Sequence, residues 1–282
     1  MNKRILIIGL GLIGGSYAEA LTNKGYEVYA ITRSQESIDF AKEKGIIKDG
    51  SIELDKSFIS SFKFVIFSLY PTVFIDWIKK NKVLLNNNAL ITDVSGVKES
   101  VIYKVKEELE DTNIEYVSHH PMAGREVYGV KNATKEIFKG ANFIVTPFDD
   151  SSDEAIETIK ELGEELGFKR VSVLDPKTHD EMIAYLSQLT HAIAVGLMCG
   201  NDNTHLKDYT GDSFRDLTRI ASINEDMWSE LFLMNKEALL KEMDMFNNAM
   251  KELRDAIENN DTDKLKEMMR TSTLRRSYFK KD

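Results

Sequence analysis

Short apolar runs alternate with stretches of helical spacing over the first 175 residues. The runs predicted as strands lie at 4–9, 27–31, 64–69, 89–93, 116–119, 142–146 and 171–174, and most are bounded by Gly, Pro, Asn or Asp. Between them, 16–23, 34–44 and 97–110 have helical patterns. This alternation predicts a parallel β-sheet covered by helices on both faces.

The pattern changes at about residue 175, after which almost no strand signal occurs. Apolar residues then recur at spacings of 4, 3, 4, 3 and 4, at Leu239, Met243, Phe246, Met250, Leu253 and Ile257. Such spacing places them on one helix face. We therefore predict an α/β chain with an N-terminal Rossmann-type domain at 1–175 and an all-helical domain at 176–282. The apolar face is either internal core or a coiled-coil-like contact between subunits, which would make the protein a homodimer.

A glycine-rich loop follows the first expected strand. Gly9, Gly11 and Gly14 match the pattern G-x-G-x-x-G, and a helical pattern begins directly after them. In this setting the first Gly permits a tight turn, the second lets the backbone approach a pyrophosphate, and the third allows close helix–strand packing. The loop, including Leu12 and Ile13, predicts a dinucleotide site at a helix N-terminus.

The end of the second expected strand indicates which dinucleotide is bound. An acid about 20 residues after the glycines would bind the ribose 2′-hydroxyl of NAD. This chain has Thr32, Arg33 and Ser34 at that point. An Arg flanked by two hydroxyls can bind a 2′-phosphate through charge-assisted hydrogen bonds. NADP is the expected cofactor, with NAD as the alternative if Arg33 is a solvated surface residue.

Further cofactor contacts are expected where the third and fourth strands end. Ser68, Leu69 and Asp93 occupy these positions. Ligands of open α/β sheets bind at the carboxyl ends of the strands. We therefore include the three residues in the predicted cofactor site.

Composition narrows the functional classes. The 282 residues are 42% apolar and 29% charged, as in ordinary globular proteins. No apolar run reaches the roughly 18 residues of a membrane span, and a net charge of −9 argues against nucleic acid as the main partner. Cys199 is the single cysteine, which fits a reducing cytoplasm. No metal site is predicted, and an anionic substrate would need a local basic pocket.

A histidine lies near the end of the fifth expected strand. Residues 118–126 read Ser-His-His-Pro-Met-Ala-Gly-Arg-Glu. His120 is expected in the loop at the strand's carboxyl end, where it can accept a proton from a hydroxyl while hydride leaves for a nicotinamide. Pro121 restricts the backbone of His120. On these residues alone, a hydrogen-bonded structural histidine is the commoner role.

Several blocks together resemble the prephenate dehydrogenase family, in the family's order and over most of the chain. They are the glycine loop, Asp-Val-Ser-Gly-Val-Lys at 93–98, His-Pro-Met-Ala-Gly at 120–124, Thr-His-Asp at 178–180, the segment 187–194, and Phe-Arg-Asp-Leu-Thr-Arg-Ile-Ala at 214–221. The resemblance implies NAD(P)-dependent oxidative decarboxylation of prephenate to 4-hydroxyphenylpyruvate, in tyrosine biosynthesis. It also implies a homodimer.

The resemblance also implies residue roles. His120 would hydrogen-bond the ring hydroxyl of the substrate and take its proton. His191 and Ser187, four residues apart and so on one helix face, would face the substrate. Arg219 would bind a substrate carboxylate. Arg215 would join it in a cationic patch if this segment is helical, or would form a surface ion pair instead.

The chain departs from the family pattern at two places. The family's loop has Gly then Ser before the hydrophobic residue and Lys, whereas this chain has Ser95 then Gly96. A serine expected to contact both hydroxyl and nicotinamide is thus displaced by one position, and we expect Ser95 to act in catalysis from there. The second departure is Thr32, where the family often has an acid, and it again indicates NADP.

Other functions remain open at this point. Arogenate, with an amino group in place of the keto oxygen of prephenate, is an alternative substrate. Another two-domain dehydrogenase, of the β-hydroxyacid dehydrogenase or imine reductase type, is an alternative enzyme; the former would need a catalytic Lys in the helical domain. A non-catalytic dinucleotide sensor would not need His120, His191 and Arg219 together.

Overall fold

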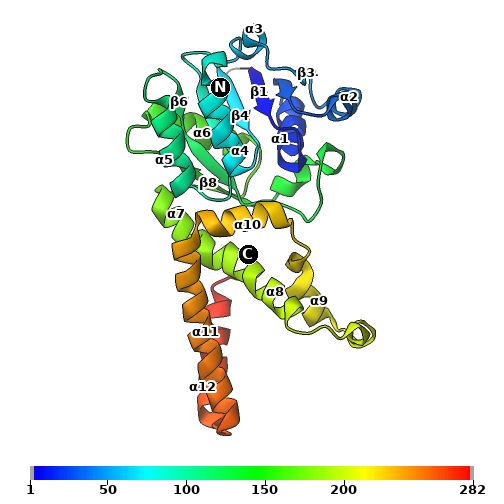
Figure 1. Ribbon diagram of the computed structural model, residues 1–282, viewed down its shortest axis with the longest axis vertical. Coiled ribbons are helices and arrows are strands. Elements are labelled where there is room, and N and C mark those ends of the chain that lie inside the picture. Colours follow the sequence, from blue (N-terminus) through cyan, green and yellow to red (C-terminus); the bar gives the residue numbers. More distant parts are fainter. Residues whose placement is uncertain (1–2, 280–282) are drawn as a thin grey trace. The chain divides into compact units, whose positions relative to one another are not determined.

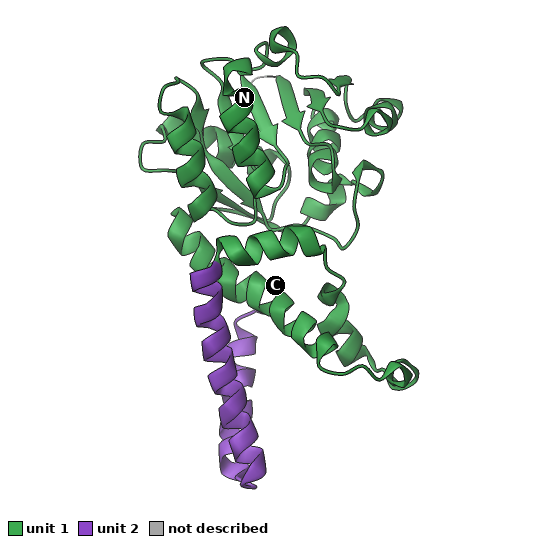
Figure 2. Cartoon of the chain, in the orientation of Figure 1, with its two compact units in different colours: residues 1–235 green, residues 236–282 purple. Residues whose placement is uncertain are grey.

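The chain forms two compact units in its computed structural model, which describes residues 3–279. The units are residues 1–235 and residues 236–282 (Figure 2). The expected domain boundary at residue 175 lies inside the first unit, where the helices after it contact the sheet domain. The division into domains at 175 therefore stays a prediction.

A six-stranded parallel sheet forms the centre of the first unit (Figure 1). Its strands are β1 Arg4–Ile8, β2 Glu27–Ile31, β3 Asp49–Ser51, β4 Phe64–Phe67, β5 Leu90–Asp93 and β6 Glu115–Tyr116, in the order β3-β2-β1-β4-β5-β6. All neighbouring pairs are parallel. This order confirms the Rossmann-type fold, and the direction of winding changes between β1 and β4, where such folds bind dinucleotides.

Helices cover both faces of this sheet, because successive strand residues point to opposite sides and are apolar on both. Ile5 and Ile7 of β1 belong to one core with α1 Leu12–Asn23, α2 Gln35–Glu43 and α6 Asp153–Glu165. Leu6 and Ile8 belong to the other core with α3 Lys56–Ile59, α4 Pro71–Asn81 and α5 Glu99–Leu109. A short 3-10 turn, η1 Lys82–Leu84, follows α4.

The expected strand at 116–119 is broken, and that detail of the prediction is wrong. β6 ends at Tyr116, and β7 Ser118–Pro121 starts a second sheet with β8 Asn142–Thr146 and β9 Arg170–Val173. β7 is antiparallel to β8, which is parallel to β9. The residues stay buried through the break, so hydrophobicity does not reveal the change of partner. His120 therefore stands in a paired strand, opposite Ile144, and not in a loop.

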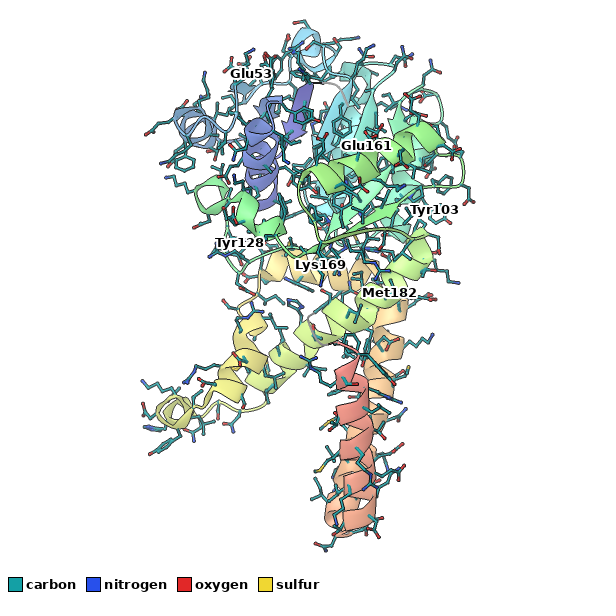
Figure 3. The ribbon with its side chains drawn as sticks, turned by 180° about the vertical axis from the view of Figure 1, so that it is seen from behind. Glu53, Tyr103, Tyr128, Glu161, Lys169 and Met182 are labelled. Atoms are coloured by element: carbon teal, nitrogen blue, oxygen red, sulfur yellow. The ribbon has the colours of Figure 1, made fainter. Side chains whose placement is uncertain are left out.

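The β7–β8 connection crosses the surface beside α1. It holds two 3-10 turns, η2 Val130–Asn132 and η3 Lys135–Phe138, and Tyr128 on it is exposed (Figure 3).

A long helical run follows β9. It consists of α7 Pro176–Ile183, the π-helical turn η4 Ala184–Leu189 and α8 Thr190–Cys199, and it leads to η5 Thr204–Tyr209, α9 Asp212–Thr218, η6 Arg219–Ala221 and α10 Glu225–Met234. By length and composition alone the run 176–199 could cross a membrane, and 28% of its most apolar stretch is buried within the chain. Tyr185 and Leu186 on it are exposed apolar side chains, as is Met182 (Figure 3).

The second unit is a pair of helices, α11 Lys236–Glu258 and α12 Thr262–Ser277. All six positions of the predicted apolar face lie in α11, as expected. Met250 and Ile257 on that face are 48% and 60% exposed, so the chain leaves part of the face uncovered.

Candidate active site

The glycine loop joins β1 to α1 more tightly than any side chain would allow. Gly9 has a φ of 101°, in the left-handed region, and a Cβ on it would lie 2.2 Å from the carbonyl oxygen of Ser68. A Cβ on Gly14 would lie 2.0 Å from the oxygen of Gly9. The loop thus packs directly on Ser68 and Leu69, and the structure brings these predicted residues together.

Gly11 faces open space instead. A Cβ on it would meet no atom within 4 Å. Gly11 caps α1 without a side-chain hydrogen bond, and the first turn of α1, which includes Leu12 and Ile13, has no acidic residue. The N–H groups of this turn are available to an anion, which the helix dipole favours. The loop therefore fits the pyrophosphate of a nicotinamide dinucleotide.

The turn after β2 carries the residues predicted to choose the cofactor. The N–H of Thr32 donates to the oxygen of Ser51 at 3.2 Å. The hydroxyl of Ser34 caps α2 by accepting the N–H of Ser37. Arg33 is exposed, and within residues 3–279 no carboxylate pairs with it.

Asp93, predicted to contact the cofactor, is buried under the site. One carboxylate oxygen accepts hydrogen bonds from the hydroxyls of Tyr116 and Ser118, and the other from the Ser95 N–H and the Lys98 ammonium. Burial alone would raise the pKa of Asp93, but the Lys98 charge and these hydrogen bonds lower it below its usual value. Asp93 is 1% exposed and both of its oxygens accept from protein donors, so it anchors the loop after β5, and its contact with the cofactor stays a prediction.

Lys98 is fully buried beside it, and sequence reasoning gave it no role. Its Nζ donates to the Ser118 hydroxyl and to the carbonyl oxygen of His119, each at 2.7 Å. These bonds fasten the start of β7 to the end of β5. They thereby fix the backbone that carries His120.

His120 contacts a second histidine from the helical run. Its Nδ1 lies 2.9 Å from Nε2 of His179, whose own Nδ1 lies 2.7 Å from Oδ1 of Asp180. Burial, followed by the neighbouring His179 and Lys98, lowers the pKa of His120 well below 6.5. Burial also lowers the pKa of His179, against the opposing effect of Asp180. Both imidazoles are neutral at pH 7.

The loop after β5 reaches the same imidazole. A Cβ on Gly96 would lie 3.9 Å from Cε1 of His120 and 3.6 Å from a methyl group of Leu231. Ser95 is 4% exposed, and its hydroxyl has no hydrogen-bond partner within the described part of the chain. The displaced serine is thus buried next to the residue that touches His120.

The helical side of the site is built on the π-helical turn. Nδ1 of His191 donates to the carbonyl oxygen of Ser187 at 2.8 Å, so the two residues share a helix face as predicted. The His191 ring stacks on Trp228 at a centroid distance of 3.7 Å. Burial lowers the pKa of His191 below 6.5. Sequence reasoning missed Trp228, because its apolar neighbours in α10 give no sign of a role.

Each of the two predicted arginines forms an ion pair with a different carboxylate. Arg219 in η6 pairs with Glu126, in the loop after β7. Arg215 pairs with Asp212 at 2.6 Å and donates to the oxygen of Thr210. The segment is helical as required, but Arg215 forms the surface ion pair given above as its alternative. Glu126 lay in a noted motif, yet nothing in the sequence indicated its partner.

Helix α10 connects the two sides of the site. Leu231 lies against Gly96, and Trp228, one turn earlier, lies against His191. The charges of Glu126 and Arg219 both act on His191. The side chains from the sheet domain and from the helices therefore surround one region.

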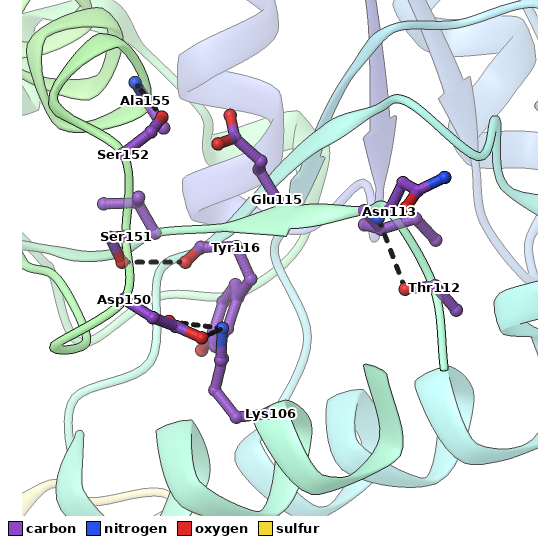
Figure 4. A pocket seen from close by; sticks show the side chains of 11 residues that line it. Lys106, Thr112, Asn113, Glu115, Tyr116, Asp150, Ser151, Ser152 and Ala155 are labelled. Atoms are coloured by element: carbon purple, nitrogen blue, oxygen red, sulfur yellow. Dashed lines mark hydrogen bonds and ion pairs between the residues drawn. The ribbon is translucent and has the colours of Figure 1, made fainter. Parts of the chain in front are cut away.

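A pocket of about 220 Å³ lies away from this region, at the amino end of β6 (Figure 4). Thr112, Glu115, Ser151 and Ser152 are among its lining residues. Lys106 crosses it, with Nζ 2.6 and 2.8 Å from the carboxylate oxygens of Asp150. No predicted site residue lines it, so it is not the candidate active site.

The strand order, the open glycine loop and a buried histidine in β7, beside the loop after β5, are the features of a nicotinamide-dependent dehydrogenase. Two family models cover most of the chain. The one described as "Prephenate dehydrogenase, nucleotide-binding domain" matches residues 17–172, and "Prephenate dehydrogenase, dimerization domain" matches residues 175–271. The chain belongs to the prephenate dehydrogenase family and is an oxidoreductase.

Individual relatives agree with this membership. Prephenate dehydrogenase of Bacillus subtilis is 30% identical over 289 residues, covering 96% of this chain and 75% of that protein. Cyclohexadienyl dehydrogenase of Zymomonas mobilis is 30% identical, covering 99% and 97%. The crystal structure of prephenate dehydrogenase from Aquifex aeolicus with hydroxyphenyl propionate and NAD+ has a TM-score of 0.90 at 29% identity, covering 99% of both chains.

Proposed function

We propose that this chain catalyses the NAD(P)-dependent oxidative decarboxylation of prephenate to 4-hydroxyphenylpyruvate. The observation that carries the proposal is the buried His120 beside Gly96, which contacts Leu231 of α10. One turn earlier on α10, Trp228 stacks on His191, on which the charge of Arg219 acts. A neutral imidazole accepts the proton of a hydroxyl, and a guanidinium binds a carboxylate through paired hydrogen bonds. The names of the relatives support the same reaction.

His120 is the general base in this proposal. Its Nε2 takes the proton of the ring hydroxyl, while the carbon–carbon bond to the ring carboxylate breaks and carbon dioxide leaves. When bound, the nicotinamide would accept hydride from the ring carbon that bears this hydroxyl. In this proposal the Ser95 hydroxyl, which has no hydrogen-bond partner within the described residues, contacts the substrate hydroxyl. Burial, followed by the neighbouring His179 and the Lys98 ammonium, lowers the pKa of His120 and so favours its basic, uncharged form.

Arg219 binds a substrate carboxylate in exchange for Glu126. The guanidinium already holds a carboxylate in the free protein, so the substrate replaces one charge-assisted bond with another. Ser187 and His191 line the substrate from the helical side, with His191 held flat against Trp228.

Arogenate is the second candidate substrate. Glu126 places a carboxylate beside Arg219, and such a pair suits the ammonium and carboxylate groups of an amino acid. NADP is the proposed cofactor, because no carboxylate within residues 3–279 pairs with Arg33, which stands between Thr32 and Ser34 in the sequence.

The reaction is tested by following absorbance at the nicotinamide band with prephenate or arogenate and with NAD or NADP. We expect turnover of prephenate with a higher kcat/KM for NADP. In His120→Asn, turnover falls by roughly 10²–10⁴, the usual range for a general base, while cofactor binding is retained. Unchanged turnover in His120→Asn would remove it from the mechanism, and a strong NAD preference would overturn the role of Arg33.

We also propose that the active protein is a cytoplasmic homodimer. The matched dimerization-domain model begins at residue 175, and the helical run that starts there leaves most of its apolar surface uncovered within one chain. A second copy would cover such a surface. A monomeric mass in solution at micromolar concentration would contradict the dimer.

A further inference from the structure

His120 is the outer member of a row of three side chains. The row runs from Asp180 through His179 to His120, with contacts of 2.7 and 2.9 Å. His179 is fully buried and Asp180 is 3% exposed. From this geometry we propose that Asp180 and His179 are positioning residues, which set the tautomer of His120 and share the proton that it takes. The idea rests on the proposed function for its catalytic consequence.

The hydrogen-bond donors assign every proton in the row. Both oxygens of Asp180 accept backbone N–H bonds, from Lys98 and Glu99, each at 2.8 Å. A carboxylate with these partners is an acceptor, so Nδ1 of His179 must donate to it. A neutral His179 then offers a lone pair at Nε2, and Nδ1 of His120 must donate in turn. The lone pair of His120 is thereby left on Nε2.

Nε2 of His120 is the atom that this row leaves for a substrate. Within residues 3–279 no protein group hydrogen-bonds to it. The opposite tautomer would carry a hydrogen at that position and could not accept a hydroxyl proton.

The row of side chains also provides a second proton acceptor, Nε2 of His179. When the O–H bond of the substrate breaks, an N–H bond forms at Nε2 of His120. The Nδ1 proton of His120 can then pass to Nε2 of His179, 2.9 Å away. The positive charge would lie on His179, next to the Asp180 carboxylate. No other reactant is needed.

The surrounding charges make this stabilisation necessary. Lys98 is a buried cation that disfavours a second positive charge on either imidazole. Asp93 is committed to Lys98 and three hydrogen-bond donors. His119 bonds instead to Tyr17 and Thr92, away from the row. Asp180 is the carboxylate in contact with the histidine pair.

A structural explanation competes with this one. Asp180 accepts the first N–H groups of α5, so the row could simply fasten α7 to the sheet domain. The two explanations differ in what they predict for kcat in folded His179 and Asp180 variants, while the proton on His120 tests the hydrogen-bond row itself. That proton can be observed without substrate or cofactor.

The first experiment is 15N NMR of the histidine rings in the free protein, whose five histidines allow assignment by single substitution. We expect His120 to carry its hydrogen on Nδ1 in the wild type. In Asp180→Asn, a measurable fraction should move to Nε2. His119→Gln serves as the control, because it alters another buried histidine and should leave the His120 tautomer unchanged.

The second experiment measures kcat and KM in folded variants. His179→Gln can still accept the Nδ1 hydrogen of His120 but cannot take a proton. We expect it to keep the tautomer and to lower kcat by about 10–10³-fold, within the range for assisted proton transfer. KM and cofactor binding should change little. Asp180→Asn should lower kcat through the tautomer as well.

The outcomes of the two experiments distinguish a failure of the proton relay from a failure of the proposed function. A wild-type His120 protonated on Nε2 would overturn the relay, as would folded His179→Gln and Asp180→Asn proteins with unchanged kcat. If the variants fail to fold, the wild-type spectrum still decides the tautomer. If the wild type turns over neither prephenate nor arogenate, the proposed function fails while the spectrum still tests the relay.

Discussion

Removing the charge of Lys98 should destabilise the protein severely. The Lys98 side chain is 0% exposed, and its partner Asp93 is 1% exposed. Lys98→Met keeps most of the buried volume but leaves the Asp93 carboxylate uncompensated. Breaking a buried pair by removing one partner costs about 3–5 kcal/mol. The hydroxyl of Ser118 and the oxygen of His119 would also each lose a hydrogen bond.

This cost translates into a measurable shift of the thermal transition. For a unit of 235 residues, each kcal/mol corresponds to roughly 2–4 °C. We therefore expect Lys98→Met to lower Tm by about 6–20 °C in a calorimetric or circular-dichroism melt.

The double variant Lys98→Met/Asp93→Asn provides the control. It removes both charges and keeps an oxygen acceptor for the hydroxyls of Tyr116 and Ser118. Its loss of stability should be smaller than the sum of the two single losses by at least about 1 kcal/mol, as for coupled neighbours. Additive effects, or a Lys98→Met protein as stable as the wild type, would show that the pair does not interact as the structure indicates.

Two further predictions concern the cofactor loop and the base. Gly11→Ala should leave Tm unchanged, because its Cβ meets no protein atom, and should weaken nucleotide binding measured by calorimetry. Gly14→Ala should unfold at lower temperature, because its Cβ would lie 2.0 Å from the Gly9 oxygen; equal melting of the two variants would contradict this. The lowered pKa of His120 keeps its basic form populated below pH 6.5, so the acid limb of the kcat/KM profile should lie below that pH. An acid limb of the kcat/KM profile at or above pH 6.5 would exclude His120 as a buried neutral base.

The fold could be predicted from the sequence because short apolar runs mark its strands and a helical spacing of apolar residues marks its long helix. Apolar runs in the first half and helical spacing in the second gave the Rossmann-type sheet, its glycine loop and the long helix α11. The break after Tyr116 could not be predicted, since residues on both sides are buried in either arrangement. Strand pairing depends on which partner is nearest in space, and local hydrophobicity does not record it.

The candidate site was predicted as residue types and not as contacts. Motifs indicated His120, His191 and Arg219; the structure brings Arg219 near His191 and buries His120 beside the loop after β5, and their joint action on a substrate stays a prediction. The partners Glu126 and Trp228 were missed, because a charged loop residue and an apolar helix residue have many ordinary roles. For Asp93 the position at the end of a strand predicted a contact with the cofactor. The hydrogen bonds that its carboxylate accepts from Tyr116 and Ser118 could not be predicted, because these residues lie far from it in the sequence.

The ion pairs also explain how a chain with a net charge of −9 can bind prephenate, which carries two carboxylates. The sequence left open a cationic patch or a surface ion pair at Arg215, and the structure shows Arg215 and Arg219 each paired with their own acid. A substrate carboxylate that replaces Glu126 on Arg219 leaves the number of charge-assisted hydrogen bonds unchanged and releases Glu126 to solvent. Substrate selectivity then depends on whether the substrate carboxylate binds the Arg219 guanidinium better than the Glu126 carboxylate does. It does not depend on a positive potential over the protein surface. The net charge would slow the approach of an anion, while the exchange at Arg219 decides whether it stays.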